Sequence, residues 1–460
     1  MGLSHTRALP LREVRPKDCP DRGLQSLSYS GYRGALAVLT GAALLLWPAL
    51  WNGYPIMFSD TGGLIEMSLE PTMGWDKPWI YGPFVHLFHW RTSLWAAVVG
   101  QAVLLSWVLF AVARRFGVPR WHIVRCAVLA VGSAAPWFAS LLMPDFFTPV
   151  VVLCLVLLAT GGSIVWAVLG AVAIAAHLSH LVLAAGCIAA LGVLQWRWPW
   201  RPGLALVGAV GLLLATNVVG YGRFTLSPNG SVFALARLIG DGPGRWYIDR
   251  VCPGAGLKLC AWSGRLATNS DDFLWAPYGP LWDRALWGDA FGPVALAPEA
   301  SRLVPAIIAA YPGPVLTAAV HNALAQLALV RVGDTLGPDF LDDAVVPKLA
   351  LYFPAAELAR FRAGRQAQGT LMPPPYALHL VLLGAGLIGT LALLTQARWR
   401  PLAGVVLIAL IANAASTGAL SAPHDRYQAR IAWLVLLPPL LVASCPRRSV
   451  RDDDAERTGA

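Results

Sequence analysis

Charged residues are scarce in this chain. Only 13% of its 460 residues are Asp, Glu, Lys or Arg, and 57% are hydrophobic. Soluble domains usually contain about 25% charged residues. The shortage of charge therefore excludes an ordinary soluble domain. Apolar runs of nearly 20 residues predict an all-α protein, a polytopic transmembrane helical bundle.

The sequence also lacks the short motifs of common soluble enzymes. It has no P-loop, no dinucleotide-binding glycine fingerprint, no GxSxG elbow and no HExxH motif in a suitable context. The formal charge of +10 does not indicate nucleic-acid binding, because the arginines cluster in short connectors between apolar segments. That placement is the positive-inside pattern of membrane proteins. The basic N-terminus has no apolar stretch, so we expect no cleaved signal peptide.

Ten apolar segments follow one another along the chain. We expect membrane spans at about 34–51, 92–113, 122–142, 147–160, 163–177, 180–195, 203–220, 376–395, 402–420 and 430–444. With ten spans, all the arginine-rich connectors and both termini fall on one side, which the positive-inside rule makes the cytoplasm. The protein is thus expected in a bacterial inner membrane, with its acidic loops facing the periplasm.

The change of composition along the chain predicts five regions. These are a cytoplasmic tail (1–33), a first transmembrane bundle with an outer loop at 52–91 (34–221), an extracytoplasmic or interfacial insertion (222–375), the last spans (376–445) and a cytoplasmic tail (446–460). Within the insertion, residues 301–331 contain three prolines. We interpret them as two membrane-surface helices, with a re-entrant hairpin as the alternative.

Two of the seven cysteines lie in the insertion. Cys252 and Cys260 flank the polar segment "VCPGAGLKLC". If this segment faces an oxidising periplasm, a disulfide is expected, and the alternative is two unlinked thiols.

Two lone acids on the outer side are the candidate catalytic residues. Asp60 follows the first span in "YPIMFSDTGG", and Asp145 lies in "LLMPDFF" between the third and fourth spans. Acids at interfacial depth are costly unless they are paired or functional. Apolar surroundings raise the pKa of a carboxyl group, which suits a general base. For each acid the structural alternative is the N-cap of a following helix.

The segment "HDRYQAR" before the last span supplies candidate phosphate ligands. Arg426 and Arg430 are four residues apart and share one helix face. Such a pair suits a phosphate group, whereas the structural alternative is anchoring of the helix end at the interface. His424, Tyr427 and Lys77 of the outer loops are further binding candidates.

A metal site has weaker support in the sequence. His177 and His180 are three residues apart, but the sequence has no tight cluster of Cys, His and Asp that would supply a third ligand. No residue is assigned as a metal ligand, and a divalent ion remains a candidate cofactor that the carboxylates would hold.

This arrangement resembles the GT-C superfamily of glycosyltransferases, including its ArnT-like and protein-mannosyltransferase-like members. The resemblance consists of an acid after the first span ("FSDTGG"), a second acid between the third and fourth spans ("MPDFF"), an H-x-R-Y motif before a late span and a large extracytoplasmic insertion. The family often has paired acids in the first loop, whereas Asp60 stands between Ser59 and Thr61.

The resemblance implies an enzyme that transfers a sugar from a polyprenyl-phosphate donor to a lipid, glycan or protein acceptor. Asp60 would be the base or would orient the acceptor, and Asp145 would support it or share a metal. Arg426 and Arg430 would hold the phosphate. The partners implied are the lipid-linked donor, the acceptor and membrane lipids, with no nucleic acid.

Two other classes of function are compatible with the sequence. A transporter or flippase for a lipid-linked substrate would be expected to carry internal repeats and polar residues at mid-membrane depth. The chain has no repeat between its halves and no carboxylate within a span. A non-catalytic protein of envelope assembly is the other alternative.

Overall fold

The computed structural model describes residues 31–195, 198–252, 254–334, 336–373 and 376–445. The predicted tails at 1–33 and 446–460 therefore lie almost wholly outside the described residues. The described chain is all-helical, as the sequence predicts, and its only β-type pairing is an isolated parallel bridge between Ile56 and Leu141. That bridge joins the segment before Asp60 to the segment before Asp145.

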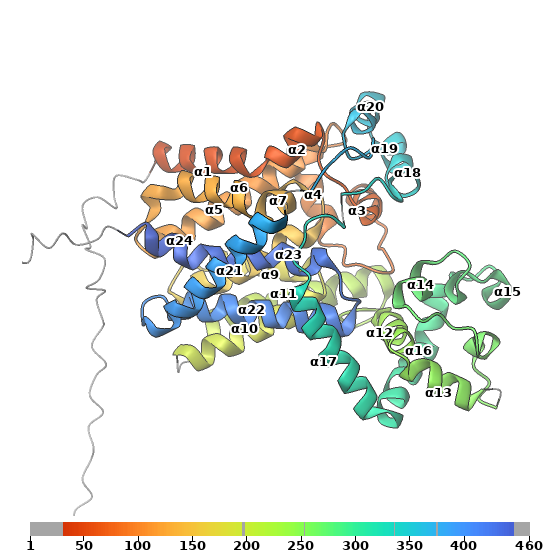
Figure 1. Ribbon diagram of the computed structural model, residues 1–460. Helices are drawn as coiled ribbons and strands as arrows, with labels where there is room; N and C mark the ends of the chain where they lie inside the picture. The colour runs from red at the N-terminus through yellow and green to blue at the C-terminus, as the bar shows by residue number, and fades with distance from the viewer. Residues whose placement is uncertain (1–30, 196–197, 253, 335, 374–375, 446–460) are drawn as a thin grey trace, which may run out of the picture.

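Long helices form a bundle that contains the N-terminal part and the last part of the chain (Figure 1). The N-terminal helices are α1 (Tyr32–Leu45), α2 (Trp47–Asn52), α5 (Trp95–Arg115), α6 (His122–Gly132), α7 (Ala135–Ser140), α8 (Phe147–Ala159), α9 (Val165–Ala175), α10 (Ser179–Gln195) and α11 (Trp200–Tyr221). The later ones are α21 (Tyr376–Ala392), α22 (Arg400–Leu420), α23 (Asp425–Ala432) and α24 (Leu437–Ala443), with the 3₁₀ turn η7 (Trp433–Leu436) between the last two.

Five of the described helical segments are long and apolar enough to cross a membrane, by length and composition. They are Trp95–Arg115, Trp200–Tyr221, Gly292–Ala310, Tyr376–Thr395 and Arg400–Leu420. Four of these coincide with expected spans, and the fifth, Gly292–Ala310, lies in the predicted insertion.

Several expected spans are shorter or broken. The segment 34–51 is interrupted at Leu46, before Pro48, and 122–142 is interrupted at Ser133, before Pro136. Proline lacks a backbone N–H and clashes with the preceding turn, so a helix ends or restarts at these positions. The segment 430–444 is likewise split, into α23, η7 and α24.

Helix α8 lies at the centre of the bundle. Every residue from Phe147 to Leu158 is buried. A helix that is apolar on all sides is stable only when neighbours cover all sides. Helices α5, α9, α10, α11 and α22 pack around it. The structure thus places the segment that follows Asp145 in the middle of the fold.

The arginine-rich connectors gather at one end of the bundle. The ring of Phe116 stacks on Trp399 with a centroid separation of 5.1 Å, and Arg398 donates to the Phe116 carbonyl oxygen. Arg125 Nη1 donates to Ser444 Oγ at 3.0 Å. The first and last described helices begin and end at this end, on the left of Figure 1. The acidic loops lie at the opposite end.

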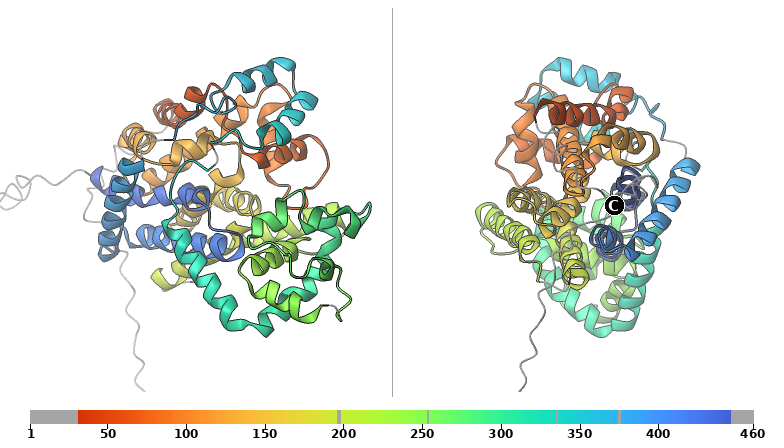
Figure 2. Two further views of the ribbon diagram at one scale, coloured as in Figure 1. Left: turned by 45° about the vertical axis from the view of Figure 1, so that its right-hand side comes forward. Right: turned by 90° about the vertical axis from the view of Figure 1, so that its left-hand side faces the viewer.

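The predicted insertion is not one body. Residues 230–310 form a separate cluster with its own core (Figure 2), built from α12 (Gly230–Gly240), α13 (Pro243–Val251), α14 (Ser270–Trp275), α15 (Arg284–Trp287) and α16 (Gly292–Ala310). Cys252 and Cys260 are joined there in a disulfide, with a Cα–Cα distance of 5.4 Å. The next helix, α17 (Pro312–Ala328), leaves this cluster and packs along α22.

Residues 301–331 thus form parts of two helices that meet at Tyr311, as their prolines indicate. The contact of α17 with α22 is close, because a Cβ at Gly418 would meet the Asn322 carbonyl oxygen at 2.5 Å. Three short helices then return to the first outer loop: α18 (Leu341–Ala344), α19 (Val346–Tyr352) and α20 (Ala355–Ala363). Their apolar residues belong to the main core.

Candidate functional site

Three segments far apart in sequence bring the candidate residues together. Asp60 lies in the first turn of α3 (Ser59–Leu69), Asp145 in the 3₁₀ turn η3 (Pro144–Phe146), and both arginines on α23. Arg426 Nη1 lies 3.8 Å from Asp60 Oδ2, and Arg430 Nη1 lies 3.2 Å from Asp145 Oδ1. The pair of arginines on one helix face therefore contacts both acids.

Helix α3 begins at a position fixed by Thr61. The N-cap is Phe58, whose backbone N–H donates to Thr61 Oγ1 at 2.9 Å, and the same hydroxyl donates to the Leu142 carbonyl oxygen at 3.1 Å. Asp60 is therefore not the N-cap, contrary to the capping alternative. Its carboxylate lies in the first turn, where the helix dipole favours a negative charge.

Asp145 is not a cap either. The N-cap of η3 is Met143 and that of α8 is Phe146. The Asp145 side chain is only 2% exposed and receives a hydrogen bond from Arg430. Its carboxylate therefore holds Arg430, and the exposed acid of the site is Asp60, at 29%.

Arg430 is wholly buried in a polar network. Its Nη2 donates to Ser179 Oγ and to Asn413 Oδ1, both at 3.0 Å. Within the described chain, its Nε has no hydrogen-bond partner. A buried guanidinium nitrogen without a partner is costly, and an anionic ligand would satisfy it.

Arg426 is held above two aromatic rings. Its guanidinium carbon lies 4.3 Å from the Phe58 ring centroid and 4.8 Å from that of Tyr427, and its Nη2 donates to Tyr427 Oη at 3.2 Å. Its Nη1 is buried and has no hydrogen-bond partner among the described residues. Arg426 and Arg430 thus each keep one donor available at the site.

Lys77 connects Asp60 to a further acid. Its Nζ donates to Asp60 Oδ1 at 3.2 Å and also pairs with Asp76. Burial alone would raise the pKa of Asp60, but Lys77 and Arg426 outweigh burial and hold that pKa below its ordinary value of 3.8. Asp60 is therefore ionised at neutral pH. The two carboxylates in turn raise the pKa of Lys77, although burial opposes this.

His177 also borders the site. His177 is joined to Arg430 through Ser179 Oγ, which accepts from Arg430 Nη2 at 3.0 Å. Its Nδ1 lies 2.8 Å from Ser179 Oγ. The sequence marked this residue only as a weak metal candidate, and its position at the site was not predicted.

Not every predicted residue joins this group. His424 Nε2 lies 3.0 Å from Asp271 Oδ2 of α14, and its backbone pairs with the side chain of Gln326. It therefore contacts the insertion. Lys77 and Tyr427 do lie at the site, as described above.

Sequence reasoning missed Asp76, Ser179 and Asn413. Asp76 precedes Lys77, so the adjacent opposite charges were a usable signal. Nothing in the sequence marks Ser179 or Asn413, because their role follows from the packing of α10 on α22 and of α22 on α23, which brings both side chains to Arg430.

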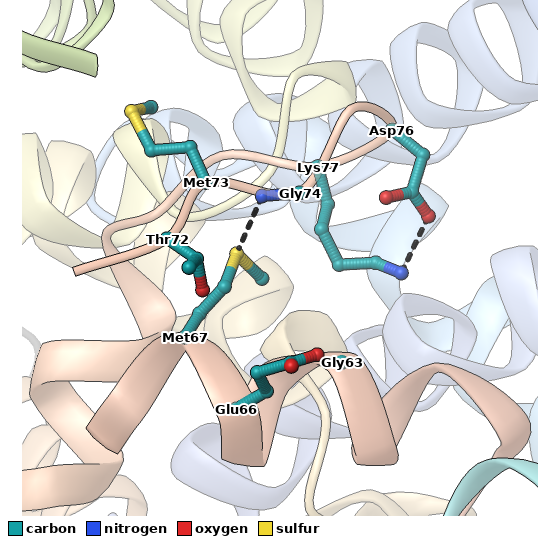
Figure 3. A pocket seen from close by; sticks show the side chains of 8 residues that line it. All are labelled: Gly63, Glu66, Met67, Thr72, Met73, Gly74, Asp76 and Lys77. Atoms are coloured by element: carbon teal, nitrogen blue, oxygen red, sulfur yellow. Dashed lines mark hydrogen bonds and ion pairs between the residues drawn. The ribbon is translucent and has the colours of Figure 1, made fainter. Parts of the chain in front are cut away.

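A cavity of about 180 Å³ adjoins Lys77. Figure 3 shows its two walls, with Gly63, Glu66 and Met67 on α3 and the loop 72–77 opposite. Gly74 N donates to Met67 Sδ at 3.2 Å, which joins the two walls.

The residues present do not fit a divalent metal ion. No group of three His, Cys, Asp or Glu side chains in the described ranges is arranged to hold one. Three cations, Lys77, Arg426 and Arg430, already neutralise the two predicted acids. His180 is engaged as well, by Thr148 Oγ1 and the Ala173 carbonyl oxygen at 2.8 Å each.

No protein family, curated protein or solved structure matches this chain.

Proposed function

We propose that the chain is an integral-membrane glycosyltransferase of the GT-C type. It would transfer a sugar from a polyprenyl-phosphate donor to an envelope acceptor at the outer face of a bacterial inner membrane. One observation carries the proposal: the ionised, partly exposed carboxylate of Asp60 lies 3.8 Å from Arg426, and Arg426 and Arg430, on one helix, each retain a buried donor nitrogen without a hydrogen-bond partner among the described residues. This is a base or orienting group next to an anion site.

The chemistry requires one bond to form and one to break. The acceptor hydroxyl oxygen attacks the anomeric carbon while the bond from that carbon to the phosphate oxygen breaks. Negative charge then collects on the departing phosphate. Arg426 Nη1 and Arg430 Nε, which have no hydrogen-bond partner among the described residues, would receive this charge and stabilise it.

Asp60 would accept a hydrogen bond from the acceptor hydroxyl and take its proton. Its lowered pKa makes it a weak base in the free protein. Its main contribution is then the orientation of the acceptor, which can supply several kcal/mol of barrier reduction. A single displacement inverts the anomeric centre.

The roles of the other acids differ from the roles implied by the resemblance. Asp145 would act through Arg430, because its carboxylate is buried and bonded to that guanidinium. No step needs a metal. Asp145 is thus a positioning residue, and Asp60 is the candidate catalytic acid.

We further propose that the chain crosses the membrane ten times, through several spans that are broken helices, with both termini in the cytoplasm. This topology is supported by the positions of the connectors: the arginine-rich connectors lie at one end of the helical bundle, and the candidate site lies among the loops at the other end. The positive-inside rule then directs the site toward the periplasm.

The test measures transfer of a labelled sugar from a polyprenyl-phosphate donor by purified protein in vesicles. Asp60→Asn keeps the size of the side chain and removes its charge, so we expect loss of at least about 100-fold in rate. Asp289→Asn, an exposed acid of the insertion, is the matched control and should transfer normally.

Arg426→Gln should weaken donor binding as well as slow transfer, because it removes a charge-assisted phosphate contact. Full activity of Asp60→Asn would exclude the proposed mechanism. Movement of intact donor between leaflets without any sugar transfer would favour a flippase.

A further inference from the structure

The cavity beside Lys77 adjoins Asp60 through that lysine, which pairs with Asp60 Oδ1, whereas Arg426 lies nearest the other oxygen, Oδ2. Asp60, Gly63 and Glu66 follow one another at intervals of three residues, so they share one face of α3. Lys77 Nζ contacts Asp60 and lines the cavity. An acceptor in this cavity would therefore approach Asp60 along the face of α3 that carries Gly63 and Glu66, beside the oxygen that pairs with Lys77.

The wall opposite α3 is fixed in place. Tyr221 Oη donates to the Gly74 carbonyl oxygen at 2.8 Å and to that of Met73 at 3.2 Å, and Asn229 Nδ2 donates to the Trp75 carbonyl oxygen at 3.0 Å. Helices α11 and α12 thus hold the loop. The cavity is preformed, which lowers the entropic cost of binding.

The lining combines acceptors of hydrogen bonds with apolar surface. Glu66 and Asp76 contribute carboxylates, Thr72 a hydroxyl, and Met67 and Met73 thioether chains. Hydroxyl groups can donate to the carboxylates, and the C–H face of a sugar ring can pack on methionine. An anionic group would meet two acids, and the lysines beside them are already engaged, Lys77 with Asp76 and Lys348 with Glu66.

We infer that this cavity is the acceptor subsite and that it takes an uncharged sugar ring, the end unit of a glycan or glycolipid. The inference depends on the proposed function. It names the acceptor class that the function leaves open, and it excludes a phosphorylated headgroup and a peptide hydroxyl as the preferred acceptor. Asp60 then stands between an anion site for the donor and a neutral sugar site for the acceptor.

Gly63 offers a direct way to fill the cavity. A Cβ there would point at Lys77 Nζ, the nearest described atom, at 3.9 Å. Alanine therefore fits without strain and should favour the helix. Leucine would project into the space that the sugar ring is to occupy. The matched control is Gly211→Leu on α11, where no described atom lies within 4 Å of an added Cβ.

The experiment compares these variants with the unmodified full chain in vesicles. It measures donor affinity, release of labelled sugar to water, and transfer to four probes: a neutral disaccharide, a glycolipid ending in the same disaccharide, the disaccharide phosphate and a serine peptide. We expect Gly63→Leu to raise the acceptor KM by about tenfold or more, equivalent to about 1.4 kcal/mol. Donor affinity should remain within about twofold.

Gly211→Leu should transfer normally. The neutral disaccharide, free or on lipid, should be the better acceptor, and the two forms show whether the lipid contributes. Normal transfer by Gly63→Leu, equal loss of donor affinity, or preference for the phosphate or the peptide would overturn the inference. If the unmodified protein releases no sugar to any acceptor or to water, the proposed function fails instead.

Discussion

The buried pair of Asp145 and Arg430 gives the most direct test of the site's architecture. At 3.2 Å and an effective dielectric constant of about 20, the attraction is about 5 kcal/mol, and the removal of both charges from water offsets much of it. Loss of one partner leaves the other charge buried and unpaired, which costs about 3–5 kcal/mol. Asp145→Asn and Arg430→Met should each destabilise the protein by this amount.

The double variant discriminates between explanations. Asp145→Asn combined with Arg430→Met leaves no buried charge, so it should cost clearly less than the sum of the single variants. The assay is thermal unfolding of the four proteins in one detergent, with Asp289→Asn as a control that should shift stability by less than about 0.5 kcal/mol. Additive losses in the double variant would refute the claim that the two charges support each other.

Three further outcomes are expected. Gly62→Ala places a Cβ 1.8 Å from a backbone carbonyl oxygen of α18, so it should lower the melting temperature, whereas Gly63→Ala should leave the melting temperature unchanged. For the free enzyme, kcat/KM for the donor should fall on acidification only below pH 3.8, where Asp60 gains its proton, and Lys77→Met should move this fall to higher pH because it removes a charge that lowers the pKa of Asp60. Reduction of the Cys252–Cys260 disulfide, which closes a loop of sequence separation 8, should destabilise the insertion by about 2–3 kcal/mol as judged by proteolysis.

The helical class followed from composition, because scarce charge and long apolar runs leave few other structures. Of the five membrane-length helices in the described chain, four also lie where spans were expected. The breaks were harder to predict. Pro48 and Pro136 were visible, but whether a proline kinks a span or ends a helix depends on the neighbours that satisfy the freed backbone groups.

The sequence does not reveal that the acids and arginines of the site come together in space. Asp60 and Arg426 are 366 positions apart, and only the packing of α3, η3 and α23 brings them into contact. The types of residue could be selected, because acids and arginines at interfacial depth need partners. Which acid pairs with which arginine could not be predicted, because that depends on how each helix is rotated about its own axis.

The return of residues 341–363 to α3 had no signal in the sequence. These helices lie within a stretch that shares its polar composition with the rest of the insertion. Yet Glu357 is buried and accepts hydrogen bonds from Tyr54 Oη at 2.7 Å and from Leu94 N at 2.8 Å. Composition distinguishes polar from apolar segments, but it does not reveal which polar side chain is buried in a contact between distant segments.

The charges at the site balance before any substrate binds, with three acids against three cations. A donor phosphate must therefore draw a cation away from an acid. The contact between Arg426 and Asp60 is the one to yield, because its 3.8 Å separation is too long for a hydrogen bond. With Arg426 turned to the phosphate, Asp60 loses a charge that lowers its pKa and gains an anion nearby, so the pKa of Asp60 rises. Donor binding would thus make Asp60 a stronger base when the acceptor needs one.

The pH dependence of the rate tests this change in the pKa of Asp60. On acidification, kcat should begin to fall at a higher pH than kcat/KM for the donor, because kcat/KM reports the free enzyme. If kcat and kcat/KM fall at the same pH, Asp60 keeps its proton affinity throughout the reaction, and the carboxylate would then act only by orienting the acceptor.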